Sequence, residues 1–284
     1  MKVLKIISLA FALVLSWDFC AYGQAWVLYD NFDKTNIDRA KWSGDEYPGT
    51  GMLFYENTRR IEADPTLGNR LHLAIRNYGP ISDLAGAVWS QNRFNFCNPE
   101  TIKGIKATIW ANSLKATGCS ANNGTSSAYA RILGYFFNTT GNTVEGSYDG
   151  NVSAQIRLFR MSNSKDPAGV LRVNSVVLLC LDDACDNSSV IASSDMGRIS
   201  SGQAVTLSIL WDQENKRFIA KKDSNAPVYL SYDGKVPTDQ YAPVVDEKRL
   251  TASCVPSRCP AGAAIPYAVA DVYIDNVYVK YLDK

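Results

Sequence analysis

Three segments of the chain alternate apolar side chains with polar and aromatic ones that could bind a ligand. Every second residue is apolar across 70–76, and similar runs occupy 128–137 and 153–161. Successive side chains of a β-strand point to opposite faces, so each segment is predicted to be a strand with one apolar and one polar face. The polar faces would carry His72, Arg76, Tyr129, Arg131, Tyr135, Gln155, Arg157 and Phe159.

The chemistry of these side chains favours recognition of an acidic sugar. A tyrosine ring stacks on the apolar face of a pyranose while its hydroxyl keeps a hydrogen bond. An arginine fork binds a carboxylate or a sulfate through two parallel hydrogen bonds. If the three strands share one curved sheet, Arg131, Arg157 and Tyr135 are predicted to meet on its concave side. The alternative is an ordinary exposed sheet face, on which arginine stems cover apolar surface.

Metal and nucleophile chemistry have weaker support in the sequence. Asp182, Asp183 and Asp186 are close enough to offer Ca²⁺ several carboxylate oxygens, although their spacing is not that of an EF-hand loop and a solvated acidic turn is the simpler interpretation. A single histidine in 284 residues disfavours zinc enzymes and histidine-based triads. We therefore predict no cofactor, with Ca²⁺ as a weak candidate.

The first residues predict a secretion signal. Lys2 and Lys5 precede an apolar run over 6–15, which is too short to span a bilayer as a helix. Small residues follow, so cleavage is expected after Gly23 or as late as Ala25. We expect a signal peptide over 1–23, one domain over 24–284 and a secreted, extracellular protein, with the periplasm as the alternative compartment.

Cleavage would also remove Cys20 and leave an even number of cysteines. In an exported chain such a set favours disulfides. The pairs Cys180–Cys185 and Cys254–Cys259 are predicted because each closes a short ring. Elimination then leaves Cys97–Cys119 as the third pair. Two C-x4-C units could instead bind zinc, which an oxidising compartment disfavours. We predict that the mature chain contains no free thiol.

The composition is that of a globular protein without a nucleic-acid partner. Apolar residues make up 46% and charged residues 20%, which excludes wholesale disorder. The 29 Lys and Arg almost balance the 28 Asp and Glu, and the net charge of +1 lacks the basic excess that nucleic-acid binding needs. We expect no membrane span. The oligomeric state is not determined by these features.

Residues beyond 25 predict an all-β fold. Helical periodicity of useful length is absent there, and further apolar or alternating runs cover 102–110, 170–181, 205–220 and 269–282. Within 205–220 the pattern breaks at 212–216 and resumes, which predicts a hairpin with a five-residue loop. Roughly twelve such runs, separated by polar turns, favour a single antiparallel β-sandwich over two small β domains.

Short motifs near both ends of the chain add a family resemblance. Asp30-Asn31-Phe32-Asp33 lies near the mature N-terminus, Asp275-Asn276-Val277 lies near the C-terminus, and the 207–220 hairpin lies between them. This pattern resembles the concanavalin A-like lectin and glucanase superfamily. The resemblance implies a jelly-roll sandwich of two curved sheets whose first and last strands are neighbours, although such a fold hosts many functions.

The catalytic motifs of that superfamily are incomplete here. Retaining glucanases use Glu-x-Asp-x-x-Glu to bring two carboxylates to one strand face, but Glu62-Ala63-Asp64-Pro65-Thr66-Leu67 has Leu67 in place of the second glutamate. Polysaccharide lyases use Gln-Ile-His, and this chain has Gln155-Ile156-Arg157. The resemblance therefore implies a non-catalytic, lectin-like protein that binds an extracellular or cell-surface polysaccharide. The alternatives are a lyase or glycoside hydrolase with an atypical site, or a structural component of an extracellular matrix or appendage.

Overall fold

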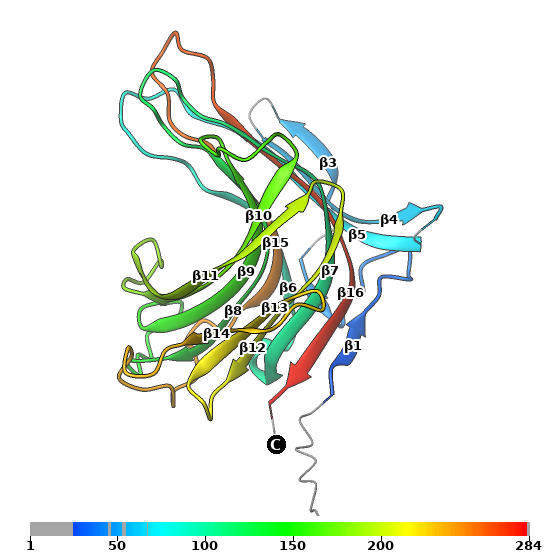
Figure 1. Ribbon diagram of the computed structural model, residues 1–284, viewed down its shortest axis with the longest axis vertical. Helices are drawn as coiled ribbons and strands as arrows, with labels where there is room; N and C mark the ends of the chain where they lie inside the picture. Colours follow the sequence, from blue (N-terminus) through cyan, green and yellow to red (C-terminus); the bar gives the residue numbers. More distant parts are fainter. Residues whose placement is uncertain (1–24, 45–46, 53–54, 67, 283–284) are drawn as a thin grey trace, which may run out of the picture.

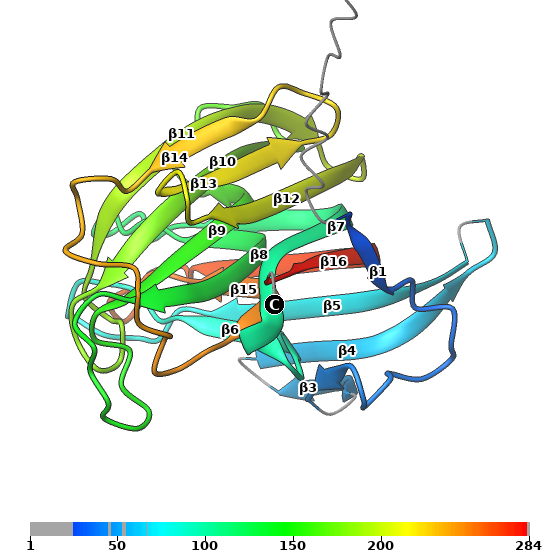
Figure 2. The same ribbon diagram turned by 90° about the horizontal axis from the view of Figure 1, so that it is seen from below.

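Two antiparallel sheets account for the sixteen strands of the computed structural model, which describes residues 25–44, 47–52, 55–66 and 68–282 (Figures 1 and 2). The predicted signal peptide lies outside the described residues. The all-β, two-sheet sandwich predicted from the alternating runs is confirmed, with more strands than the sequence indicated. A single 3₁₀ turn, Pro99–Thr101, is the helix found in the described part of the chain.

The nine-stranded sheet is built around the longest strands. Its order is β14 (Val228–Ser231), β13 (Arg217–Lys222), β12 (Ala204–Asp212), β7 (Ile102–Thr117), β16 (Tyr267–Tyr281), β5 (Gly68–Tyr78), β4 (Tyr55–Asp64) and β3 (Tyr47–Met52). The ninth strand, β1 (Val27–Asp30), pairs with β16, with Val27 opposite Val279. The first and last strands are thus neighbours, as the resemblance implied.

The seven-stranded sheet lies across the core from the first. Its order is β11 (Ser188–Ser200), β10 (Val170–Cys180), β9 (Asn151–Met161), β8 (Ser127–Asn138), β15 (Lys248–Val255), β6 (Ser90–Phe96) and β2 (Trp42–Ser43). Its β11 lies beside β14 of the other sheet (Figure 2). There Lys222 of β13 donates through Nζ to the carbonyl of Arg198 at 3.0 Å, which ties the two sheets together at this edge.

Alternation along the strands decides which side chains enter the core. Leu71, Leu73 and Ile75 of β5 are buried, whereas His72 and Arg76 lie on the outer face, as predicted. The predicted hairpin is also confirmed, because β12 and β13 pair from Leu207 opposite Lys222 to Asp212 opposite Arg217.

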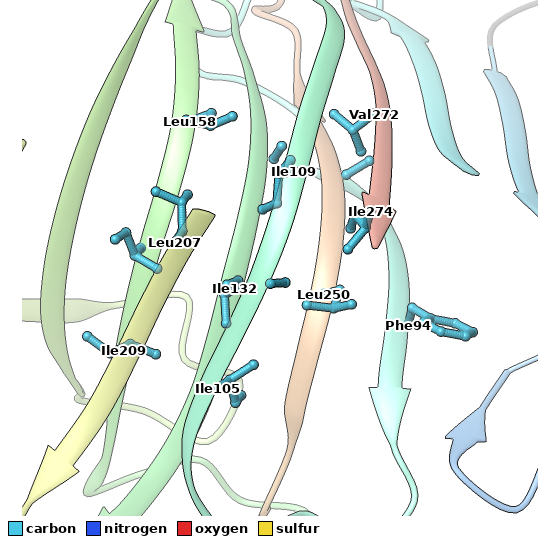
Figure 3. Packing of buried hydrophobic residues seen from close by; sticks show 14 of the residues in the cluster. Phe94, Ile105, Ile109, Ile132, Leu158, Leu207, Ile209, Leu250, Val272 and Ile274 are labelled. Atoms are coloured by element: carbon cyan, nitrogen blue, oxygen red, sulfur yellow. The ribbon is translucent and has the colours of Figure 1, made fainter. Parts of the chain in front are cut away.

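The core fills the space between the two sheets. Figure 3 shows Ile132 and Leu158 of the seven-stranded sheet together with Ile109, Leu207 and Val272 of the nine-stranded sheet, and all five are fully buried. Deleting a buried side chain of this size costs about 2–5 kcal/mol, so these positions fix the relative placement of the sheets. Each sheet therefore has one face in the core and one outer face that is free to carry polar chemistry.

The cysteine pairing agrees with only one of the three predicted bridges. Cys180 and Cys185 form a disulfide, as the short spacing predicted. The second bridge joins Cys119 to Cys259 across 140 residues of sequence, so the predicted Cys97–Cys119 and Cys254–Cys259 pairs are wrong.

The physical reason for the mispairing lies in β15. Cys254 is on the core side of β15 and fully buried, whereas Cys259 lies beyond the end of that strand beside the loop of Cys119. Neither Cys97 nor Cys254 is bridged to a cysteine that the structure describes, which contradicts the predicted absence of free thiols. Burial raises the pKa of the Cys254 thiol to about 12, which disfavours the nucleophilic thiolate form.

No helix in the described residues is long and apolar enough to cross a membrane.

Candidate ligand-binding face

The predicted ligand-binding residues fall on two different sheets. Tyr129, Arg131 and Tyr135 lie on β8, and Gln155 and Arg157 lie on its neighbour β9, so these five share the outer face of the seven-stranded sheet. His72 and Arg76 lie on β5 in the nine-stranded sheet, so grouping them with the other five was wrong. Alternation fixes which face of a strand is apolar, but not which sheet the strand joins.

The pairing of β8 with β9 brings two arginines directly opposite each other. Arg131 of β8 is directly opposite Arg157 of β9. The next opposed pair, Ile132 and Ile156, points into the core, so both arginines point to the outer face. Directly opposed side chains on antiparallel strands have Cβ atoms about 4.5–5.5 Å apart, and like charges there destabilise the sheet. On the other side of β8, Thr251 of β15 is opposite Arg131.

Arg131 is held by neutral hydrogen-bond acceptors only. Its guanidinium donates to Oε1 of Gln91 at 3.0 Å, to Oε1 of Gln155 at 3.2 Å and to Oγ1 of Thr251 at 3.3 Å. The residue is 3% exposed, and none of the described carboxylates lies within ion-pair distance of it. Burial, followed by the charges of Arg249 and Arg157, lowers the pKa of Arg131 to about 9. The cation is therefore buried without a counter-charge.

Arg157 has the same character. Its Nε donates to Oδ1 of Asn174 at 2.8 Å, and no described carboxylate pairs with it. The guanidinium carbon lies 5.2 Å from the ring centroid of Tyr129 and 5.5 Å from that of Phe159. Burial lowers the pKa of Arg157 below its ordinary value. The contacts with the two rings compensate only in part for the hydration that the Arg157 guanidinium loses on burial.

A row of three aromatic rings runs beside the two arginines. Trp89 stacks on Tyr129 at 6.0 Å between ring centroids, and Tyr129 stacks on Phe159 at 6.1 Å. Trp89 is 47% exposed and lies under the Arg131 guanidinium at 4.8 Å. Trp89 is exposed and Tyr129 and Phe159 are partly exposed, so the apolar ring surface of this row could contact successive sugar rings. We refer to the face formed by Trp89, Tyr129, Arg131, Arg157 and Phe159 as the arginine–aromatic face.

A cavity of about 240 Å³ adjoins Phe159. It continues along the ends of β9 and β10 and is lined also by Lys165 and Arg172. Arg172 is paired there with Asp166 at 2.5 Å. The cavity extends the aromatic row, so a ligand longer than one sugar unit has room beyond Phe159.

The other end of the face is closed by packing. Tyr135 is only 6% exposed, and its ring packs 4.9 Å from that of Tyr148 and against Cys180 of the small disulfide ring. Burial raises the pKa of the Tyr135 hydroxyl. Tyr135 is therefore on the predicted face, but its ring is a packed wall rather than the open stacking platform that the sequence predicted. Arg249, also on this side, pairs with Glu247.

His72 belongs to a separate network on the nine-stranded sheet. Its Nε2 lies 2.8 Å from Oδ1 of Asp271, and its Nδ1 lies 2.8 Å from Oε2 of Glu62. The imidazole stacks on Tyr273 at 4.4 Å, and the Tyr273 hydroxyl donates to Glu62. Asn112 donates to the second oxygen of Asp271 at 2.8 Å. Both carboxylates of this network accept hydrogen bonds from groups of the fold, whereas Arg131 and Arg157 pair with no described carboxylate.

The pKa values of the Glu62 and Asp271 carboxyl groups reflect these hydrogen bonds. Burial alone would raise both values, but hydrogen bonds from Arg60 and Tyr273 hold the pKa of Glu62 below its ordinary value. Hydrogen bonds from His72 and Asn112 do the same for Asp271. Glu62, the first residue of the partial glucanase motif, is thus a member of a structural network on β4 and lies in the sheet opposite the arginine–aromatic face.

The weak calcium candidate is not assembled as a cluster. The Asp182 carboxylate accepts the backbone N–H groups of Asp186 and Asn187, whereas Asp183 accepts a hydrogen bond from Ser147. No group of three His, Cys, Asp or Glu side chains that could hold a metal ion occurs among the residues that the structure describes. The Ca²⁺ site stays a prediction from the sequence.

Several residues of the face escaped the sequence reasoning. Gln91 comes from β6 and Thr251 from β15, two strands that the sequence analysis did not predict, and Trp89 was not among the predicted ligand-binding residues. The segment Arg249-Leu250-Thr251-Ala252-Ser253 alternates polar and apolar residues as the recognised strands do, and that period could have identified β15.

Comparisons with known proteins found similar solved structures at low sequence identity. No family model matches the chain, and no curated protein sequence matches it. Solved structures similar to it include a Bacteroides ovatus mixed-linkage glucan GH16 protein in complex with a product (13% identity, 88% of this chain, 98% of that chain, TM-score 0.43). Another is a glycoside hydrolase family protein from Mycobacterium thermorestibile (13% identity, 89% of this chain, 98% of that chain, TM-score 0.42). A third is the catalytic domain of a Thermotoga petrophila laminarinase (13% identity, 92% of this chain, 99% of that chain, TM-score 0.41).

Proposed function

We propose that this chain is a secreted, lectin-like protein that binds an acidic polysaccharide through the arginine–aromatic face of its seven-stranded sheet. The observation that carries the proposal is the Arg131–Arg157 pair. The two residues lie directly opposite each other on neighbouring strands, both are largely buried, and neither is paired with a described carboxylate.

An anionic ligand accounts for this arrangement in physical terms. Two opposed guanidinium groups repel each other, and burial removes the water that would screen them. A uronate carboxylate or a sugar sulfate would supply the missing counter-charge for both arginines and accept forked hydrogen bonds from Arg157, whose two terminal nitrogens have no hydrogen-bond partner among the described residues. A neutral polymer would leave the repulsion in place. The adjacent rings of Trp89, Tyr129 and Phe159 would stack on the sugar units that carry the acidic groups.

The same residues favour binding without bond cleavage. A lyase needs a base that removes the proton next to the uronate carboxyl group. Arg157 occupies the position of the histidine in the lyase motif, and an arginine is protonated at neutral pH. Tyr135 is the other candidate, but burial raises the pKa of its hydroxyl and so opposes its ionisation. The proposal therefore assigns Arg157 to recognition of charge.

A panel of immobilised polysaccharides tests the proposal. The mature protein is expected to bind polygalacturonate and alginate, or dextran sulfate if sulfate is the preferred group, and not a neutral mixed-linkage glucan. Binding should weaken as salt increases, because the charges on the face are then screened. Arg157→Ala should weaken binding about 10- to 100-fold, since a hydrogen bond to a charged group is worth about 1.5–3 kcal/mol.

Arg217→Ala is the matched control. Arg217 also lies over a tyrosine ring, at 4.3 Å from the centroid of Tyr229, but it belongs to β13 in the other sheet and is paired with Asp212. This control should bind as the unaltered protein does. Equal binding to the neutral glucan, or equal losses in both variants, would refute the proposal. Release of unsaturated uronate ends during incubation would instead identify a lyase.

A further inference from the structure

The cavity of about 240 Å³ at the end of the β9–β10 hairpin has a lining that suits an anion. Two of its side chains are cationic, two are apolar, two are neutral hydrogen-bonding groups, and none of the six is acidic. They are Phe159, Met161, Asn163, Ser164, Lys165 and Arg172. Apolar walls with a few converging polar groups are the usual make-up of a ligand site.

Strand register places this cavity beside the arginine–aromatic face. Phe159 of β9 is opposite Arg172 of β10, which is opposite Arg198 of β11. Two residues along the same strands, Arg157 is opposite Asn174. Because side chains two residues apart share a face, Arg157 and Arg172 are diagonal neighbours on the outer face, about 7–8 Å apart along the backbone. Phe159 is next to both, so one ligand can contact all three.

One carboxylate serves two arginines at this cavity. Asp166 accepts a hydrogen bond from Nε of Arg172 at 2.5 Å and from Nε of Arg198 at 2.6 Å. The terminal nitrogens of both guanidinium groups have no partner among the described residues. Lys165 is exposed and forms no ion pair with any of those residues either. Three cations therefore share one carboxylate, and an anionic ligand would reduce the repulsion between them.

The loop that carries Lys165 is fixed by Arg160. The Arg160 guanidinium donates to the carbonyl groups of Asp166, Pro167 and Val170, at 2.9 to 3.0 Å. These three bonds hold the turn between β9 and β10 against the end of the sheet. The backbone of Lys165 is therefore in place before a ligand arrives, which lowers the ordering cost of binding.

We propose that this cavity binds a second acidic group of the same polysaccharide chain that occupies the arginine–aromatic face. The carboxylate or sulfate lies between Lys165 and the terminal nitrogens of Arg172, and the chain between the two acidic groups passes over Phe159. The protein therefore selects polysaccharides whose acidic groups recur at short intervals and discriminates against chains with isolated acidic units. This selectivity rests on the function proposed above.

Calorimetric titration with a galacturonate tetrasaccharide tests the cavity separately from the face. The unaltered protein is expected to bind one tetrasaccharide per chain, and Lys165→Glu should weaken this binding about 10-fold, because an attraction at the protein surface becomes a repulsion. Lys221→Glu is the matched control, since Lys221 is an exposed lysine of β13 in the other sheet and forms no ion pair with a described residue. It changes the net charge equally and should bind as the unaltered protein does. A sulfated tetrasaccharide in parallel identifies which acidic group is preferred.

The outcomes separate the two proposals. Binding that is weakened in Arg157→Ala but unchanged in Lys165→Glu, or weakened equally in both charge-reversal variants, would overturn the cavity and leave the proposed function intact. Binding that is weakened in Lys165→Glu but unchanged in Arg157→Ala would overturn the proposed function and leave the cavity as an anion site. Two tetrasaccharides per unaltered chain would overturn the claim that one polysaccharide chain spans both positions.

A pair of polymers tests the selectivity. Polygalacturonate carries an acidic group on every unit, whereas the same polymer with most carboxyl groups methyl-esterified carries isolated ones. The unaltered protein should prefer the unesterified polymer, and the ratio of the two affinities should be smaller in Lys165→Glu than in Lys221→Glu. Equal ratios in these two variants would overturn the selectivity.

Discussion

The outer faces of the two sheets handle buried charge in opposite ways. On the nine-stranded sheet, His72 lies between Glu62 and Asp271, and each carboxylate has further donors in Tyr273 and Asn112. On the seven-stranded sheet, Arg131 and Arg157 face each other with amide and hydroxyl partners only. The first arrangement is satisfied by groups of the fold, whereas the second has no counter-charge among the described residues. The comparison teaches that a polar sheet face can be structural, as around His72, and that the missing counter-charge is what leads us to propose a ligand for the other face.

The largest expected effect concerns the network around His72. Asp271→Ala should lower the free energy of unfolding by about 1.5–3 kcal/mol, because it removes an acceptor of two hydrogen bonds, one of them from His72. Chemical denaturation in urea measures this change. Ser113→Ala, at the neighbouring position on β7, is the control and should change the value by less than about 0.5 kcal/mol. If the two variants were equally stable, the network would not support the fold, and the contrast between the faces would disappear.

A smaller effect on stability is expected at Arg131. Arg131→Met loses three hydrogen bonds to neutral groups, but it also removes a buried charge and keeps an apolar side chain of similar length. These effects oppose each other, so the free energy of unfolding should change by less than about 1 kcal/mol. The same variant should lose the rise in melting temperature that polygalacturonate gives to the unaltered protein. A loss of stability above that bound, with ligand protection retained, would show that Arg131 is structural.

The smallest expected effect is a change in how steeply the free energy of unfolding falls with pH in acid. The pKa values of Glu62 and Asp271 are lowered in the fold, so their stabilisation is complete above their ordinary values of 4.5 and 3.8. It is lost as pH falls through the values they have in the folded protein. The free energy of unfolding should therefore fall below about pH 4, and Asp271→Asn should fall less steeply. Arg131→Met should keep the original slope, since arginine stays protonated throughout acid. Identical slopes in Asp271→Asn and the unaltered protein would contradict this assignment.

The sequence was sufficient for the fold class and for the face of each recognised strand. The period of two placed Leu71, Leu73 and Ile75 in the core and His72 on the surface, because burial of alternate residues is a local property of a strand. Membership of a sheet is a long-range property. β5 and β8 show the same alternation, yet hydrogen bonding of β5 to β4 and β16 separates His72 from the arginines.

Long-range contacts also explain what was missed at the candidate site and in the disulfides. The partners of Arg131 come from β6, β9 and β15, and no local pattern links Gln91 or Thr251 to it. In the same way Cys119 finds Cys259 across 140 residues, whereas the short spacing from Cys254 to Cys259 suggested a bridge that the inward orientation of Cys254 prevents. The sequence predicted only that Arg131 and Arg157 share a face. That they lie directly opposite each other depends on the register of β8 and β9, which the sequence does not specify.

A crystal structure of the protein with a galacturonate tetrasaccharide is the most direct test of the central claim that the arginine–aromatic face binds an acidic glycan. The account predicts a uronate carboxylate within hydrogen-bond distance of the Arg157 guanidinium, with a sugar ring stacked on Tyr129 or Phe159. Arg131 should keep its bonds to Gln91 and Gln155 while its charge is neutralised by the same ligand. A tetrasaccharide that binds elsewhere on the molecule and leaves this face empty, at concentrations that saturate binding in solution, would contradict the account.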